Sequence, residues 1–133
     1  MGITSFLILH TMMTYENEYA TYQIIEGILH VKYKNIAVDL PEAVYIVKDR
    51  LDLQEGQFMP VLCDIRDIKE INKAARIYLS IEGSAFIKAV AFIVESPVSE
   101  MLSQFYLRTS KPTIPTEAFD NIHDALVYLN AYR

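Results

Sequence analysis

The chain has 133 residues, of which 52% are hydrophobic and 22% are charged, which suits one packed domain and excludes a disordered chain. Its 12 basic and 17 acidic residues give a formal net charge of −5. This charge argues against a general nucleic-acid binder, because such proteins need a basic surface, and we expect no nucleic-acid partner.

The first 18 residues are expected to be an N-terminal extension or arm, followed by a single domain over residues 19–133. The apolar run FLIL at 6–9 has no basic flank and is shorter than a signal peptide or a membrane span requires, so no span is predicted. Residues 1–14 are expected to form an extra strand or an interface arm. Alternatively, they are an over-extended reading frame whose natural start is one of the methionines at 12 and 13.

Alternating polar and apolar residues predict a β-hairpin at the start of the domain. YATYQII at 19–25 and ILHVKYK at 28–34 are rich in β-branched and aromatic residues, which favour strands. Glu26 and Gly27 lie between them, where a tight turn is expected. The hairpin leaves an edge strand, and because such edges are usually covered or paired, we expect self-association into a homodimer.

The pattern then changes to alternating helices and strands. A helix is predicted to begin after Asp39, because Glu42 lies three residues later as in a capping box and Pro41 suits a first helical turn. The apolar residues on its expected inward face are Val44, Val47 and Leu51.

The next unit is the strand PVLCDI at 60–65, which runs into a second helix. We expect Asp67 and Glu70 to form another capping box and to open a helix that extends to about Ile81, with Gly83 as its stop. The residues predicted to face inward are Ile71, Ala74, Ala75 and Tyr78.

A third strand–helix unit follows. KAVAFIVES at 88–96 contains a continuous apolar run, which is typical of a strand covered on both faces. Ser96 is predicted to cap the next helix, with Pro97 at its first position. The apolar residues at helical spacing on this helix are expected to pack it on the sheet; they are Val98, Met101, Leu102, Phe105 and Tyr106.

The chain ends with a short strand predicted at 117–119 and a helix capped by Asp120 or Asn121, whose apolar stripe is Ile122, Ala125, Leu126 and Leu129. The order of elements is therefore ββ-α-β-α-β-α-β-α. It predicts an α/β fold with a mostly parallel mixed sheet, an N-terminal antiparallel hairpin and helices packed on the sheet.

The residues that usually carry chemistry do not form a recognisable set. His10, His30 and His123 lie in unrelated elements, so no metal site is predicted. Cys63 lies within an apolar strand and is expected to be a buried hydrophobe; as the only cysteine, it favours a reducing, cytoplasmic compartment. The sequence contains no G-x-S-x-G, G-x-G-x-x-G or P-loop motif. We therefore expect no catalytic residue, no cofactor and no enzymatic activity.

Four segments in this order resemble the SpoIIAA-like, or STAS-type, domain family. They are YQIIEGILHVKYK, PVLCDIRDIKEINKAARIYL, KAVAFIVESPVSEMLSQFYL and KPTIPTEAFDNIHDALVYL, and they span about residues 19–131. The resemblance implies a βα domain that works through protein partners. Members that resemble anti-sigma factor antagonists carry a phosphorylatable serine at the start of the helix that follows the strand equivalent to PVLCDI. This chain has Asn72-Lys73-Ala74-Ala75 at that place, so the switch serine is missing.

The charged residues after Cys63 are the candidate partner surface of a non-enzymatic regulatory or protein-interaction module. These residues are Asp64, Arg66, Lys69, Lys73 and Arg76. The alternative interpretation of the lysines and arginine on the helix is a solvated face. The alternative function is a carrier of a small apolar or lipid-like ligand, as in CRAL-TRIO proteins of related topology. That function would use the apolar residues Met101, Leu102, Phe105 and Tyr106 together with the FLIL segment at 6–9.

Overall fold

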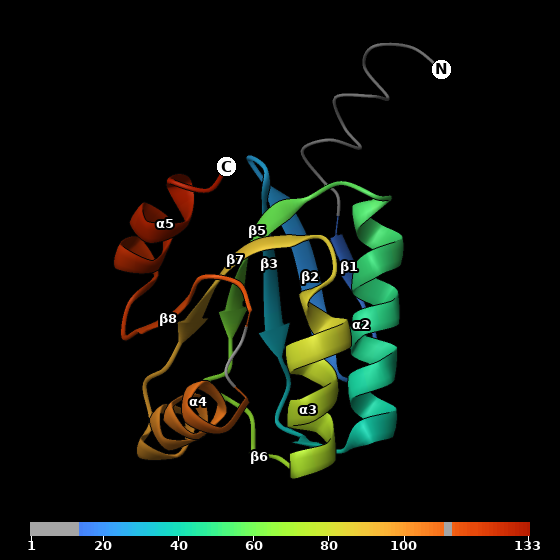
Figure 1. The fold of residues 1–133 in the computed structure, drawn as a ribbon, viewed down its shortest axis with the longest axis vertical. Helices are drawn as coiled ribbons and strands as arrows, with labels where there is room; N and C mark the ends of the chain where they lie inside the picture. Colours follow the sequence, from blue (N-terminus) through green and yellow to red (C-terminus); the bar gives the residue numbers. More distant parts are fainter. Residues whose placement is uncertain (1–13, 111–112) are drawn as a thin grey trace.

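The computed structural model describes residues 14–110 and 113–133, and it confirms the predicted α/β class. Six strands form one sheet in the order β1-β2-β3-β5-β7-β8, and β4 and β6 form a separate small pair (Figure 1). The strands are β1 (Thr14–Glu16), β2 (Ala20–Ile25), β3 (Ile28–Tyr33), β4 (Ala37–Val38), β5 (Met59–Asp64), β6 (Glu70–Ile71), β7 (Ile87–Ile93) and β8 (Thr116–Phe119). The helices are α2 (Leu40–Gln54), α3 (Lys73–Ile81), α4 (Pro97–Ser110) and α5 (Ile122–Asn130), and a 3₁₀ turn covers Glu82–Ser84.

The N-terminal half of the sheet is antiparallel, as predicted. β2 and β3 pair from Ala20 with Tyr33 to Ile25 with Ile28, and both turn residues between them have positive φ angles. β1 adds to the outer side of β2, so three residues of the predicted arm belong to the sheet. β3, β5, β7 and β8 then run parallel to one another, because each connection crosses over through a helix.

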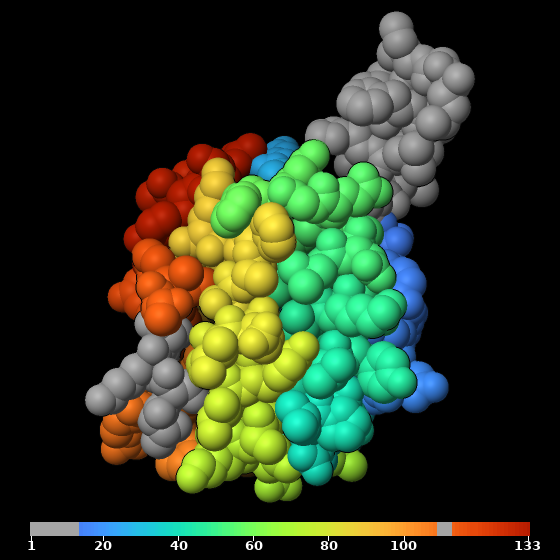
Figure 2. All heavy atoms as spheres, turned by 45° about the vertical axis from the view of Figure 1, so that its right-hand side comes forward, coloured from blue at the N-terminus to red at the C-terminus, as the bar shows by residue number. Residues whose placement is uncertain are grey.

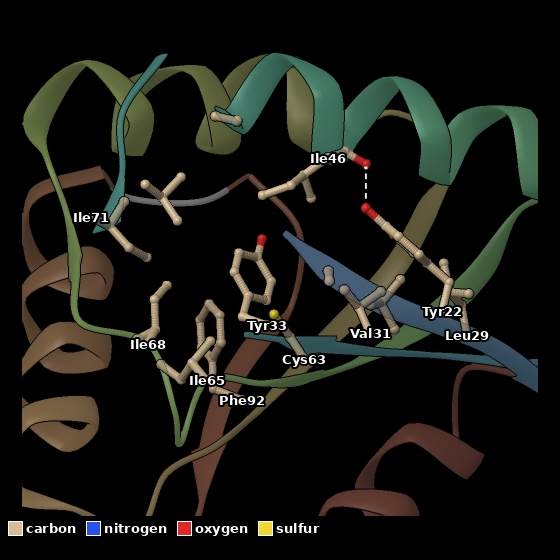
Figure 3. Close-up of a cluster of buried hydrophobic side chains, with 14 of the residues drawn as sticks. Tyr22, Leu29, Val31, Tyr33, Ile46, Cys63, Ile65, Ile68, Ile71 and Phe92 are labelled. Atoms are coloured by element: carbon tan, nitrogen blue, oxygen red, sulfur yellow. Dashed lines mark hydrogen bonds between the residues drawn. The ribbon is translucent and has the colours of Figure 1, made fainter. Parts of the chain in front are cut away.

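Helices cover both faces of the sheet unequally. α2, α3 and α4 pack on one face, where the larger core contains Ala43, Ile46 and Ala75 from the helices. α5 packs on the other face, where Ala125 and Leu129 contact the small residues of β7. Figure 3 shows the larger core, in which the Tyr22 hydroxyl donates to the backbone oxygen of Ile46 at 3.1 Å. Within residues 14–110 and 113–133, no helix packs on the α5 side of β1 and of much of β2 and β3, so the described residues leave that part of the sheet open.

The predicted start of the second helix is wrong. α3 begins at Lys73, and its N-cap is Asn72, whose side chain accepts a hydrogen bond from the Ala75 N–H at 3.0 Å. Residues 70–71 instead form β6, which pairs in parallel with β4. The buried side chain of Ile71 therefore enters the core from a strand and not from a helix.

Asp67 has a different role from the predicted cap. Its backbone oxygen accepts a hydrogen bond from the Asn35 side chain at 2.9 Å, and its carboxylate lies 3.9 Å from the Lys32 ammonium. The loop that contains Asp67 thus joins β5 to β6 in place of the first turn of a helix. A tertiary pairing between two short strands has overridden a local capping pattern.

The caps of the other helices are confirmed, and their inward faces agree with the prediction only in part: Val47, Ala125 and Leu129 are buried as predicted. Asp39 and Glu42 form the capping box of α2, Ser96 accepts from the Ser99 N–H at 3.1 Å, and Asn121 caps α5. Val44 is exposed, as are Ala74 and Ile122. The residues that α2 buries are Ala43, Ile46, Val47, Arg50 and Gln54.

α4 shows the largest difference. Ser99 and Ser103 are 0% and 1% exposed, whereas Val98 and Met101 are 45% and 63% exposed. Of the five apolar residues that were predicted to face inward, only Leu102 and Tyr106 pack against the core. α4 is therefore rotated so that Ser99 and Ser103 meet the protein interior beside Leu102 and Tyr106, while Val98, Met101 and Phe105 face outward.

Candidate functional site

An ion pair stands at the carboxyl end of β5, where the sequence indicated a site. Arg66 donates from Nε to Oδ1 of Asp64 at 2.9 Å and from Nη2 to Oδ2 at 2.7 Å. The Arg66 backbone N–H also donates to Oδ1 at 3.1 Å. The same guanidinium reaches Glu95, after β7, at 3.4 Å. Arg66 therefore links the ends of two adjacent parallel strands.

This geometry fixes the charge states of both side chains. Burial raises the pKa of Asp64, but the hydrogen bonds and charge of Arg66 outweigh it, so the pKa lies below its usual range. The hydrogen bonds that Arg66 donates to Asp64 raise the pKa of Arg66 further above its already high value. Both oxygens of Asp64 are engaged, which makes this carboxylate a poor general base.

Asp64 and Arg66 line a groove of about 680 Å³ on the open part of the sheet. His30 lies in the same groove, so the structure brings a histidine and an aspartate to one polar surface. Burial lowers the pKa of His30, which keeps the imidazole neutral at pH 7. The groove brings His30 and Asp64 together, but Arg66 occupies the carboxylate of Asp64.

The other predicted surface residues lie elsewhere. Lys73 and Arg76 belong to α3, on the opposite face of the sheet from the groove, and Lys69 lies in the loop before β6. Lys69 and Lys73 are exposed. Arg76 donates to the Ile71 backbone oxygen at 2.7 Å, and its guanidinium carbon lies 4.3 Å from the ring centre of Phe105 in α4. The predicted surface is thus divided into two sites. The first is the Asp64–Arg66 pair beside the groove, and the second is the start of α3 with Lys73 and Arg76. Arg76 connects this second site to α4 through Phe105.

Exposed apolar side chains surround this second site. Ile77 and Ile81 of α3 are exposed, and Val98, Met101 and Phe105 are exposed on α4. Figure 2 shows α3 packed beside α2, and α3 also contacts α4. Sequence reasoning assigned the α4 residues to the core. The signal against this assignment was the pair Ser99 and Ser103, which are four residues apart and occupy the face that the helix buries.

The start of α3 has no hydroxyl side chain. Asn72, Lys73, Ala74 and Ala75 form its cap and first turn. The first serine of the helix is Ser80, which is buried and donates to the Ile77 backbone oxygen at 2.9 Å.

A small internal cavity lies between the sheet and helices α2, α3 and α4. Its volume is about 80 Å³, and Leu102 and Tyr106 are among its lining residues, whereas Met101 and Phe105 are not. Ligand sites for drug-sized molecules usually measure about 300–1,000 Å³. The cavity is therefore too small for the lipid-like ligand of the alternative hypothesis, and the FLIL segment of that hypothesis lies outside the described residues.

The model of a family described as "Domain of unknown function (DUF7793)" matches residues 22–133 of the chain. The chain belongs to this family. No curated protein matches this DUF7793 member. Within residues 14–110 and 113–133, no helix is long and apolar enough to cross a membrane, and no three His, Cys, Asp or Glu residues gather as metal ligands.

Two solved structures are similar to this DUF7793 domain. One is an uncharacterised protein of the DUF3478 family with a SpoIIAA-like fold from Shewanella loihica PV-4, with a TM-score of 0.60, 16% identity and coverage of 86% of this chain and 98% of the other. The second is an anti-sigma factor antagonist from Mycobacterium paratuberculosis, with a TM-score of 0.63, 12% identity and coverage of 84% and 92%. The similarity confirms the SpoIIAA-like fold that the sequence segments indicated.

Proposed function

We propose that this protein is a non-enzymatic regulatory module that binds a protein partner through one surface, the α3–α4 face. This face consists of Lys73, Arg76, Ile77, Ile81, Val98, Met101 and Phe105. The observation that carries the proposal is the orientation of α4, which exposes Val98 and Met101 while it buries Ser99 and Ser103. Exposed clusters of large apolar side chains on soluble domains are most often interaction sites.

The composition of the face indicates the chemistry of the partner. Its apolar residues are flanked by Lys73 and Arg76 on α3 and by Arg108 in the last turn of α4. The whole chain carries a net charge of −5, so the positive charge beside this face contrasts with the acidic rest of the protein. A partner surface with apolar side chains and carboxylates complements such a face and is guided to it by charge.

Binding through this face is proposed to be independent of phosphorylation at the start of α3. The resemblance implies a switch in which phosphorylation at that position adds negative charge next to the partner surface. Here the corresponding positions hold Asn72 to Ala75, with no hydroxyl to modify. The similarity in fold to an anti-sigma factor antagonist supports a protein as the partner.

Affinity capture from the native cell with matched variants tests the proposal. We expect the double variant Lys73→Glu with Arg76→Glu to capture at least tenfold less partner than the wild type. The single variant Met101→Glu is expected to show the same loss. The matched control is Lys48→Glu with Lys88→Glu, which changes the net charge equally at exposed positions on α2 and β7. Retention of the partner by the α3 double variant and by Met101→Glu would refute the face as the binding site.

We also propose that the chain is cytoplasmic and forms a homodimer through the sheet edge. β1 pairs with β2 on one side, and its three residues are exposed. No strand of the described part of the chain pairs with its other side, and an edge of this kind can pair with a second copy. Light scattering at micromolar concentration is expected to give twice the mass of the chain, and a mass of one chain would exclude the dimer.

A further inference from the structure

Arg50 is a buried cation without an acidic partner. Its side chain lies in the interior between α2 and the sheet and is only 4% exposed. Nη1 donates to the Gln54 side-chain oxygen and to the Ala85 backbone oxygen at 3.0 Å, and Nη2 donates to the Gly83 backbone oxygen at 3.1 Å. Across the described parts of the chain, no carboxylate forms an ion pair with Arg50.

The groups nearest to Arg50 do not supply the missing negative charge. Tyr22, Tyr33 and Cys63 are the titratable groups whose charges would act on it. Burial raises the pKa of both tyrosines, and burial raises the pKa of Cys63 to about 12, so all three are neutral at pH 7. Removing a charge from water without a counter-charge is costly, and carbonyl dipoles offset only part of that cost.

Arg50 retains unused hydrogen-bond donors. A guanidinium has five N–H groups, and the three bonds from Arg50 use both hydrogens of Nη1 and one of Nη2. The Nε hydrogen and one Nη2 hydrogen remain. Arg66 uses the same two nitrogens to hold the carboxylate of Asp64. Arg50 thus has one hydrogen left on each of these two nitrogens, Nε and Nη2.

The cavity of about 80 Å³ lies against Arg50. Its other walls are mainly apolar and include Val47, Leu79, Val90 and Leu102. The hydroxyls of Ser80, Ser84 and Ser103 also line it, but each donates to a backbone oxygen in its own helix or turn. The hydroxyls of Tyr33 and Tyr106 line it too, so a molecule in this space meets hydroxyl donors as well, and Arg50 is the one charged side chain among the described lining residues.

We infer that the cavity binds a small monocarboxylate with a short apolar tail, such as acetate or propionate, whose carboxylate pairs with Arg50. The carboxylate supplies the absent counter-charge, and the apolar walls receive the tail. The volume limits the ligand to a few non-hydrogen atoms, and ligands of that size bind in the millimolar range. This site is separate from the α3–α4 face, so its test does not depend on the proposed partner.

The decisive experiment compares acetate with acetamide, which has nearly the same shape and no charge, at constant ionic strength set with chloride. In the full chain, the Nε–H resonance of Arg50 is followed by NMR, and the melting temperature is recorded in parallel. We expect a saturable shift of the resonance and a higher melting temperature with acetate, and neither with acetamide or chloride. Equal responses to acetate and acetamide, or no saturable shift with acetate, would overturn the inference.

Two variants locate the binding. Arg50→Met is expected to abolish the thermal response to acetate. Ser103→Val keeps Arg50 but fills part of the cavity, and it is expected to weaken acetate binding at least tenfold. If Arg50→Met does not fold, the response of Ser103→Val to acetate tests by itself whether acetate binds in the cavity. An undiminished response in folded Ser103→Val would place acetate outside the cavity and overturn the inference.

Discussion

Arg66 holds both carboxylate oxygens of Asp64, through Nε at 2.9 Å and Nη2 at 2.7 Å, although the two residues are only two positions apart. The pair closes the loop that leaves β5 and extends to Glu95 after β7. Charge-assisted bonds of this two-point geometry are stronger than neutral ones.

Arg66→Met is expected to destabilise the fold by about 1.5–3 kcal/mol, since it leaves the buried carboxylate of Asp64 without its partner. Urea denaturation at pH 7 measures the change. The matched control is Lys32→Met, which removes a solvent-exposed pair with Asp67 and is expected to cost less than about 1 kcal/mol. Equal effects of the two variants would contradict this account of Asp64.

The contribution of Asp64 should depend on pH in one direction. Its pKa in the folded protein lies below the ordinary value of 3.8, so the ionised form favours folding. The stability difference between wild type and Arg66→Met is therefore full above pH 3.8 and shrinks as the pH falls through the folded pKa. Denaturation curves at stepwise lower pH measure this difference. If this stability difference disappeared at a pH at which Asp64 is still ionised, the Asp64–Arg66 pair could not be its cause.

Two substitutions test whether Asn72 or Asp67 caps α3. Asn72→Ala removes the acceptor for the Ala75 N–H and is expected to cost about 1 kcal/mol. Asp67→Ala removes an exposed side chain that does not cap the helix and is expected to change the stability by less than about 0.5 kcal/mol. Chemical denaturation of both variants decides the matter, and the opposite ranking would restore Asp67 as the cap.

Cys63 should be unreactive in the folded protein. Burial raises the pKa of its thiol to about 12, and the thiolate is the reactive form. Iodoacetamide at pH 8 is therefore expected to alkylate Cys63 only after unfolding by urea, with mass spectrometry as the readout. Rapid alkylation without urea would show that the strand opens or that the thiol is accessible.

The orientation of α4 can be tested by two neighbouring substitutions. Met101→Gln is expected to change the stability by less than about 0.5 kcal/mol, because the side chain faces solvent. Leu102→Ala is expected to cost about 2 kcal/mol, because this side chain packs on the core and lines the cavity. Thermal or urea unfolding compares them. A larger cost for Met101→Gln would mean that the helix is rotated the other way.

Local patterns in the sequence were sufficient for the elements whose signals involve only neighbouring residues. The hairpin follows from alternation around Glu26 and Gly27. Asp39 with Glu42 specifies the start of α2, and Ser96 the start of α4, because a cap satisfies N–H groups within the same first turn. The order of elements, with the resemblance to SpoIIAA-like domains, then indicated the sheet.

The candidate surface was only partly predictable. Asp64, Arg66 and Arg76 were identified as surface candidates, but the structure separates the Asp64–Arg66 pair from Arg76 by placing them on opposite faces of the sheet. Asp64 is the last residue of β5, and Arg66 folds back onto its carboxylate. Arg76 belongs to α3, which packs on the other face of the sheet, and local sequence does not indicate which face a helix will cover.

Two features depended on tertiary structure alone, and both concern which side of a helix meets the sheet. α4 has apolar residues on both sides, so spacing permits either Met101 or Leu102 to face inward, and contact with the core selects Leu102. Arg50 is a residue type that sequence reasoning places in solvent, yet the carbonyl oxygens of Gly83 and Ala85 hold it inside. The sequence by itself therefore determined the elements and their order, because those depend on hydrogen bonds and periodicity along the chain. The tertiary structure decided the helix faces, the buried cation and the cavity beside it, because those depend on contacts between residues far apart in the chain.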